Sequence, residues 1–248
     1  MKSARTLNPY EETQLARHGG DRQILLASNA PVEHITGKAE FCGLVFSVTE
    51  NVLIPRIETE ELVEKVVAAC RTFSGPGAVR IVDVGTGSGA IAISVASKLA
   101  TLGLAHTITA TDISRSALEI AEANAATLLP DPTTITFLHS DLLSDVPTDQ
   151  DIIVANLPYI PTARIATLDK SVFEHEPHLA LDGGPDGLYL IRLLLDQATQ
   201  LLQPGALVLL EVDDTHTLEV WSEFEHDWQI EVFLDSFEKN RFVQLLKR

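Results

Sequence analysis

The chain has few cysteines and no long apolar run. Only Cys42 and Cys70 occur in 248 residues, and they form no close-spaced motif. We therefore expect reduced thiols and a cytoplasmic location. No apolar run approaches the roughly 20 residues that cross a bilayer, so we expect no membrane partner. The first nine residues also lack the apolar region of a secretory signal peptide.

Positive charge is scarce as well. Eighteen Lys and Arg residues stand against 35 Asp and Glu residues, which gives a formal net charge of −17. This excess would repel a phosphate backbone unless a local basic patch overrode it, so we expect no nucleic acid partner. The remaining composition, with 45% hydrophobic and 21% charged residues, is typical of an ordinary globular protein.

The character of the chain changes near residue 78, which predicts two parts. Residues 1–77 should form an N-terminal extension, and residues 78–248 should form the main domain. Within the extension, the pattern predicts a short helical segment, a β-hairpin near residues 39–48 and a helix over residues 59–73.

The stretch Ser74-Gly-Pro-Gly77 is typical of a linker or tight turn. After it, strands and helices alternate, which predicts an α/β fold with a mainly parallel sheet and helices on both faces. The last two strands should form an antiparallel edge. The predicted strands are 79–84, 106–111, 134–138, 151–155, 206–212, 228–235 and 241–246, and the predicted helices are 89–100, 116–128 and 187–202.

Polar residues gather where the predicted parallel strands end, and open parallel sheets bind ligands beyond these carboxyl ends. The first strand runs into Asp83-Val-Gly-Thr-Gly-Ser-Gly89, and the second ends at Asp112. The third leads to Ser140-Asp141, and the fourth ends at Asn156. Glycines let the first loop turn sharply and approach a ligand, and the next helix begins with free N–H groups.

The glycine loop alone leaves alternatives open. Gly85, Gly87 and Ala90 satisfy the G-x-G-x-x-A pattern of dinucleotide-binding proteins. A nicotinamide dehydrogenase is therefore one alternative, and glycines that serve only close helix–strand packing are another. Asp83 before the loop and an amide at the fourth strand are not needed for hydride transfer. Both suit S-adenosylmethionine, whose amino group and ribose hydroxyls need carboxylate acceptors.

The stretch Asn156-Leu-Pro-Tyr159 suits methyl transfer to an amide or an aromatic amine. The lone pair of such a nitrogen is delocalised, so its NH2 group must be held in one orientation. The Asn156 side-chain oxygen and the Leu157 carbonyl are two acceptors that can do this. Pro158 biases Leu157 away from the helical region and so fixes that carbonyl, and Tyr159 offers a flat face. A simple turn residue is the alternative for Asn156.

Together these stretches resemble the class I methyltransferase fold with the (N/D/S)-x-P-(Y/F/W) signature of N-methyltransferases. More closely, the chain resembles the HemK/PrmC family, which methylates the glutamine of the Gly-Gly-Gln loop in peptide chain release factors. The more specific stretches are Leu53–Glu60 and Glu176–Leu188, and other matches are Thr36–Leu44, Asp83–Ala92, Leu202–Gly205 and Arg241–Val243.

The resemblance implies a Rossmann-like sheet of seven strands, S-adenosylmethionine as the cofactor and release factors as the protein partner. It implies that Gly85 to Gly89 hold the methionine part of the cofactor. Asp112 would hold the ribose hydroxyls, and Asp141 with Leu142 would lie at the adenine. The full predicted cofactor set is Asp83, Gly85, Thr86, Gly87, Ser88, Gly89, Asp112, Asp141, Leu142 and Asn156.

The same resemblance implies that Asn156, Leu157, Pro158 and Tyr159 bind the glutamine, with Asn156, Pro158 and Tyr159 as the catalytic residues. The usual N-P-P-Y of the family is N-L-P-Y here. That form is also typical of ribosomal RNA adenine dimethylases, so an N6-adenine methyltransferase acting on RNA or DNA is the main alternative. A non-catalytic adaptor that keeps only the fold is a further one.

Other features depart from the family or have no assigned role. The region ahead of Thr36 is shorter than the helical substrate-recognition domain of the family, and Glu211-Val-Asp-Asp214 replaces a family glycine. Arg56 and Glu58 belong either to a segment that covers the site or to a surface ion-pair segment. We predict no metal site at His175-Glu-Pro-His178, because the proline disfavours helical presentation of both histidines.

Overall fold

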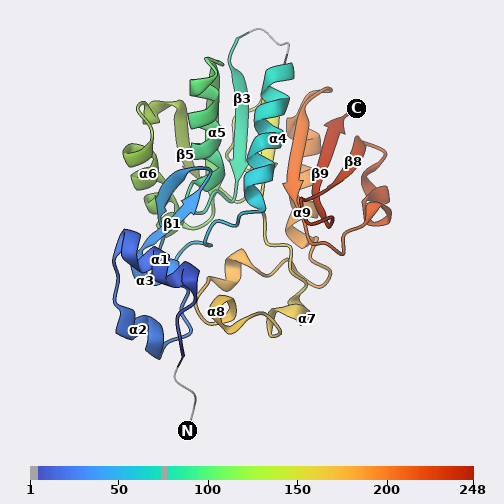
Figure 1. Ribbon diagram of the computed structural model, residues 1–248. Helices are drawn as coiled ribbons and strands as arrows, with labels where there is room; N and C mark the ends of the chain where they lie inside the picture. The colour runs from blue at the N-terminus through green and yellow to red at the C-terminus, as the bar shows by residue number, and fades with distance from the viewer. Residues whose placement is uncertain (1–4, 74–76) are drawn as a thin grey trace.

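A seven-stranded sheet forms the centre of the molecule. The computed structural model describes residues 5–73 and 77–248, so most of the predicted linker, residues 74–76, lies outside it. The strands are β3 (Val79–Val84), β4 (His106–Asp112), β5 (Ile135–His139), β6 (Ile152–Ala155), β7 (Leu207–Glu211), β8 (Trp228–Leu234) and β9 (Asn240–Lys247). Their order in the sheet is β5-β4-β3-β6-β7-β9-β8 (Figure 1).

The pairing confirms the prediction of a mainly parallel sheet with an antiparallel edge. Strands β5, β4, β3, β6 and β7 pair in parallel, and β9 runs antiparallel to both β7 and β8. All four residues of β6 are buried. A strand covered on both faces is apolar throughout, and this is why β6 was visible in the sequence as a continuous apolar run.

Helices cover both faces of the sheet. On one face lie α4 (Thr59–Thr72), α5 (Ala90–Thr101) and α6 (Arg115–Leu128), and on the other lies α9 (Tyr189–Leu201) (Figure 1). Neighbouring residues of β3 point to opposite faces, since Ile81 packs in the cluster of α4 and α5 and Val82 packs in the cluster of α9. The short 3-10 helix η3 (Leu218–Phe224) contributes Trp221 to the second cluster.

The N-terminal part lies at the carboxyl edge of the sheet (Figure 1). It contains α1 (Pro9–His18), α2 (Arg22–Ala27), α3 (Val32–Thr36) and an antiparallel hairpin of β1 (Lys38–Phe41) and β2 (Leu44–Ser47). Phe41 and Phe46 of the hairpin belong to the same buried cluster as α4 and α5. The division of the chain near residue 78 stays a prediction.

A long excursion joins β6 to α9 at the same edge. It contains α7 (Thr162–Ile165), α8 (Lys170–Phe173) and the 3-10 helix η2 (His178–Ala180), and a further 3-10 helix, η1 (Pro132–Thr134), precedes β5. The sequence did not predict these elements, because three or four residues are too few to show a helical period. Among the described residues, no helix has both the length and the apolar character needed to cross a bilayer.

Phe46→Ala should lower the free energy of unfolding by about 3–5 kcal/mol, because it empties a fully buried site. The Phe46 ring lies edge-on to Phe41, with 6.1 Å between centroids. Val45→Ala, on the same strand but 39% exposed, should change that free energy by no more than about 0.5 kcal/mol. Urea unfolding followed by tryptophan fluorescence measures both. Equal losses would show that the hairpin does not pack on the sheet domain.

Candidate active site

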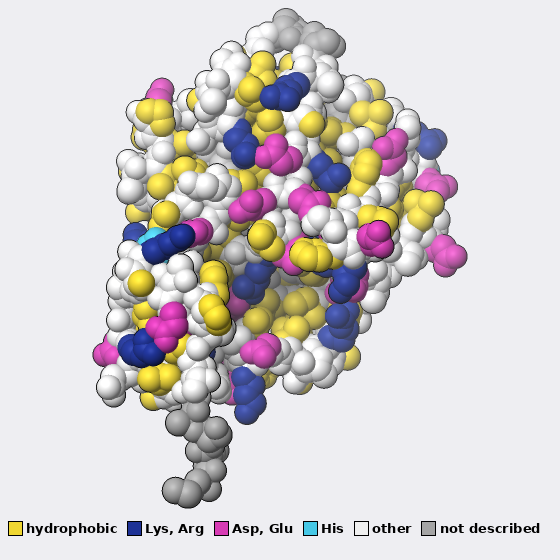
Figure 2. Space-filling model, in the orientation of Figure 1, with side chains coloured by type: hydrophobic (Ala, Val, Ile, Leu, Met, Phe, Trp, Pro, Cys, Tyr) yellow, Lys and Arg dark blue, Asp and Glu magenta, His cyan; other side chains and the backbone are white. Residues whose placement is uncertain are grey.

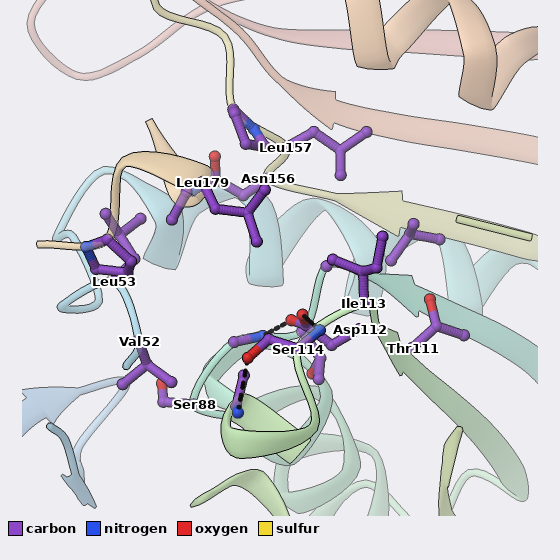
Figure 3. Close-up of a pocket in the computed structure, with 18 of the residues that line it drawn as sticks. Val52, Leu53, Ser88, Thr111, Asp112, Ile113, Ser114, Asn156, Leu157 and Leu179 are labelled. Atoms are coloured by element: carbon purple, nitrogen blue, oxygen red, sulfur yellow. Dashed lines mark hydrogen bonds between the residues drawn. The ribbon is translucent and has the colours of Figure 1, made fainter. Parts of the chain in front are cut away.

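A cavity of about 300 Å³ lies at the carboxyl ends of the parallel strands. Asn156, Leu157 and Leu179 lie across it from Asp112 and Ser114, and Val52 and Leu53 form a further side (Figure 3). The predicted site residues that line it are Gly85, Thr86, Gly87, Ser88, Asp112, Asp141, Leu142, Asn156, Leu157 and Pro158. Asp83, Gly89 and Tyr159, which were also predicted to belong to the site, are not among the lining residues.

The glycine loop leaves β3 and is held by Asp112 at the end of β4. The backbone N–H of Gly87 donates to Asp112 Oδ2 at 2.9 Å, and that of Ser114 donates to Oδ1 at 2.8 Å. Gly87 has a φ of +56°, and an added Cβ would meet no atom of the described residues within 4 Å. The positive φ favours glycine, and the missing side chain leaves that part of the cavity open.

Asp83 lies fully buried beneath the loop. Its Oδ2 accepts hydrogen bonds from the Thr86 hydroxyl at 2.7 Å and the Ala92 N–H at 3.1 Å. Among the described residues, its Oδ1 has no partner. Burial raises the pKa of Asp83 to about 7, against the opposing effect of the two hydrogen bonds, and the charge of Asp112 adds to the rise.

Asn156 is joined to two residues outside its own loop. Its Nδ2 donates to the Thr59 hydroxyl oxygen at 3.1 Å, and that hydroxyl donates to Glu211 Oε2 at 2.6 Å. Tyr159 donates its phenol proton to the other carboxylate oxygen, Oε1, at 3.0 Å. Tyr159 therefore points at Glu211, behind the cavity wall. Its predicted role as a flat face for a planar substrate group stays a prediction.

Arg56 ties the segment before α4 to the excursion after β6. Its Nη2 lies 2.6 Å from Glu176 Oε1, and the Ile54 N–H donates to Glu176 Oε2 at 3.2 Å. The Glu176 side chain is 1% exposed, so a buried carboxylate holds the two segments together. Of the two alternatives for Arg56, the structure therefore favours a segment that covers the site. Glu58 makes no capping hydrogen bond at the start of α4.

The loop before α9 packs directly on Asn156–Tyr159. An added Cβ at Gly187, where φ is +82°, would overlap the carbonyl oxygen of Tyr159. Only glycine permits this close approach. The Glu176–Leu188 stretch, which resembled the HemK/PrmC family, therefore forms part of the wall behind Asn156.

The sequence did not assign a role to Thr59, Glu176 or Glu211. Thr59 and Glu176 lie in the two stretches that resembled the family, but nothing in their spacing indicated that they face the site. Glu211 was noted only because a family glycine is missing after it. A buried acid at the end of a central strand was the available signal, since such a group needs hydrogen-bond donors.

In the part of the chain that the structure describes, no group of three or more His, Cys, Asp or Glu side chains could hold a metal ion. His178 directs its Nε2 to the carbonyl oxygen of Phe173 at 2.9 Å. The prediction of no metal rests on the sequence argument about the proline.

The strand order, the glycine loop and the carboxylates at the strand ends define a class I methyltransferase. Residues 62–184 match the family model described as Methyltransferase small domain. Among solved structures, magnesium protoporphyrin IX methyltransferase from Synechocystis PCC 6803 with bound SAM shares the fold, with a TM-score of 0.52 and 16% identity. The match covers 97% of this chain and 93% of that one.

Curated relatives define the family more closely. The release factor glutamine methyltransferase of Bradyrhizobium diazoefficiens is 40% identical over 216 residues, which cover 85% of this chain and 68% of that protein. The protein of the same name from Deinococcus radiodurans is 36% identical over 219 residues, which cover 88% and 75%. The chain belongs to the release factor glutamine methyltransferase family.

Asp83→Asn should change how stability depends on pH. The Asp83 pKa of about 7 in the folded state lies above the value near 3.9 expected for an unfolded chain. The folded state therefore holds this proton more tightly, and stability falls as pH rises toward 7. Asparagine has no such proton, so wild type should lose stability relative to Asp83→Asn between pH 5.5 and 8. Urea unfolding at both values checks this, and a constant difference would contradict it.

Proposed function

We propose that this protein transfers a methyl group from S-adenosylmethionine to the side-chain amide nitrogen of the glutamine in the Gly-Gly-Gln loop of a peptide chain release factor. One observation carries the proposal. Asn156 and Leu157 line the same cavity as Asp112, from the opposite side (Figure 3), and the glycine loop and Pro158 line it as well. An amide-binding edge therefore faces the place where the cofactor fits.

The cavity suits the cofactor in three respects. The missing side chain of Gly87 leaves room for the methionine part. The buried Asp83 has an oxygen with no partner among the described residues, and a nearby ammonium group would favour its ionised form and pair with it. Each oxygen of Asp112 accepts one backbone N–H of the loops, which leaves lone pairs for two ribose hydroxyls. Asp141 and Leu142 also line the cavity, and we place the adenine beside them.

The residues on the opposite side orient the glutamine. The Asn156 side-chain oxygen and the Leu157 carbonyl accept no hydrogen bond from the described residues, so both are available to the two N–H groups of a primary amide. Bound S-adenosylmethionine supplies a methyl carbon on a positively charged sulfur. The held nitrogen would form a bond to that carbon as the carbon–sulfur bond breaks with its electron pair left on sulfur, and the nitrogen would give one proton to solvent.

The charges around the site favour a protein substrate over a nucleic acid. Residues 156–170, all described, contain Arg164 and Lys170 as their only cations. Arg164 lies 2.8 Å from the carboxylate of Asp213, and Lys170 forms no ion pair with a described residue. Within residues 156–170, Lys170 is thus the one cation without a described ion pair, and one such cation is few for holding a phosphate backbone.

A groove of about 530 Å³ gives a peptide loop a route to the cavity. It lies between the N-terminal elements and α8, where the surface is hollowed (Figure 2). Arg56 lines both the groove and the cavity, so the two adjoin. We place the release factor over this groove, with its glutamine directed between Arg56 and Asn156.

Incubation with labelled S-adenosylmethionine should label a release factor, and replacement of the glutamine in its Gly-Gly-Gln loop by alanine should abolish the labelling. Ribosomal RNA in the same reactions should remain unlabelled, because residues 156–170 carry too few cations to hold a phosphate backbone. Scintillation counting of the separated protein and RNA fractions measures both. Methylated adenine in RNA, with release factors untouched, would establish the alternative substrate.

Asp112→Ala and Asn156→Ala should separate binding from chemistry. Asp112→Ala removes an acceptor of the ribose hydroxyls and should weaken cofactor affinity by about 10–100-fold. Asn156→Ala should leave that affinity nearly intact and lower kcat by about 10²–10³-fold, on the scale of one lost preorganised contact. Calorimetry and initial rates give the two quantities. A wild-type kcat in Asn156→Ala would show that Asn156 serves only as a turn residue.

A further inference from the structure

We infer that Thr59 and Glu211 are positioning residues that hold the Asn156 side chain with its oxygen toward the substrate. The inference rests on the proposed function, in which that oxygen accepts an N–H of the substrate amide. A primary amide side chain has two nearly isosteric orientations, one with oxygen and one with NH2 toward the cavity. Only the first presents an acceptor, so turnover depends on what fixes the choice.

Glu211 is the fixed end of the hydrogen-bonded chain. It ends β7 and is 1% exposed, and its two carboxylate oxygens accept hydrogen bonds from two hydroxyls, those of Thr59 and Tyr159. An ionised carboxylate can only accept hydrogen bonds. When Glu211 is ionised, the single hydroxyl proton of Thr59 is committed to it, over a distance of 2.6 Å.

Thr59 in turn sets the orientation of the Asn156 side-chain amide. With its proton committed to Glu211, the Thr59 oxygen has only lone pairs to offer, so the group facing it must be a donor. The Asn156 NH2 meets this need at 3.1 Å. The reversed side chain would set its oxygen against the Thr59 oxygen with no proton between them. The Asn156 oxygen is thus left on the cavity side.

The surroundings keep both residues in place. Thr59 is 4% exposed in the first turn of α4, and the ion pair of Arg56 with buried Glu176 anchors the segment just before it. Burial raises the pKa of Glu211, and the nearby charge of Glu58 adds to the rise. The hydrogen bonds from Thr59 and Tyr159 and the charge of Arg241 favour the ionised form instead.

Thr59→Val tests the inference directly, since it removes the hydroxyl and keeps the shape of the side chain. The kcat for release factor methylation should fall about 10–100-fold, because the Asn156 NH2 loses its buried acceptor. Cofactor affinity measured by calorimetry should not change. Thr59→Ser restores the hydroxyl and should recover kcat to within about threefold of wild type.

Two further variants complete the comparison. Glu211→Gln gives the Thr59 hydroxyl a neighbour that also donates, so its proton is no longer committed, and kcat should fall as in Thr59→Val. Thr72→Val is the matched control, because Thr72 is exposed at the other end of the same helix and, among the described residues, its hydroxyl bonds only to the Ala69 carbonyl. It should retain wild-type kcat. Wild-type kcat in Thr59→Val, or a loss that Thr59→Ser does not restore, would overturn the inference.

A spectroscopic measurement separates this inference from the proposed function. The Asn156 side-chain NH2 gives a pair of nitrogen-15 correlated NMR signals, assigned by their absence in Asn156→Asp. In wild type these protons should exchange slowly with solvent, and in Thr59→Val they should shift and exchange at least about tenfold faster. If no release factor is labelled, the proposed function fails, and these signals still decide the positioning role. Unchanged signals in Thr59→Val would overturn it.

Discussion

Buried carboxylates hold the active-site edge of this molecule together. A carboxylate that leaves water must gain donors or lose its charge, and the donors here come from other segments of the chain. Glu176 takes them from Ile54 and Arg56, and Glu211 takes them from Thr59 and Tyr159. Each acid therefore joins the segment that leads into α4 to elements that follow β6.

This constraint explains why two distant stretches act together. The Leu53–Glu60 stretch supplies donors, and the Glu176–Leu188 stretch supplies a buried acid and the glycine that packs on Tyr159. The cavity wall thus consists of loops held by charge and close packing, on a sheet whose strand ends are fixed by apolar burial. A loop fixed in this way can present its polar groups with little reorganisation, which is what transition-state stabilisation requires.

Packing and ion pairing also explain two departures from the family pattern, Leu157 and the stretch Glu211–Asp214. Leu157 is 4% exposed, and its Cδ2 would lie 3.1 Å from a Cβ added at Gly85. Its side chain therefore packs against the glycine loop, while its carbonyl stays available at the cavity. Glu211-Val-Asp-Asp214 has no glycine, and its acids are engaged, since Asp213 pairs with Arg164 and so holds α7 near the end of β7.

The sequence by itself determined the sheet, the glycine loop and the strand-end residues Asp112 and Asn156, because apolar period and turn chemistry are local signals. It did not show α7 and α8, which are too short for a period, and it gave Thr59 and Glu176 no role. Thr59 meets Glu211 across 152 positions, and Arg56 meets Glu176 across 120. Only the tertiary structure decided these pairs. A buried acid requires hydrogen-bond donors, but only the folded backbone brings a particular donor within hydrogen-bonding distance.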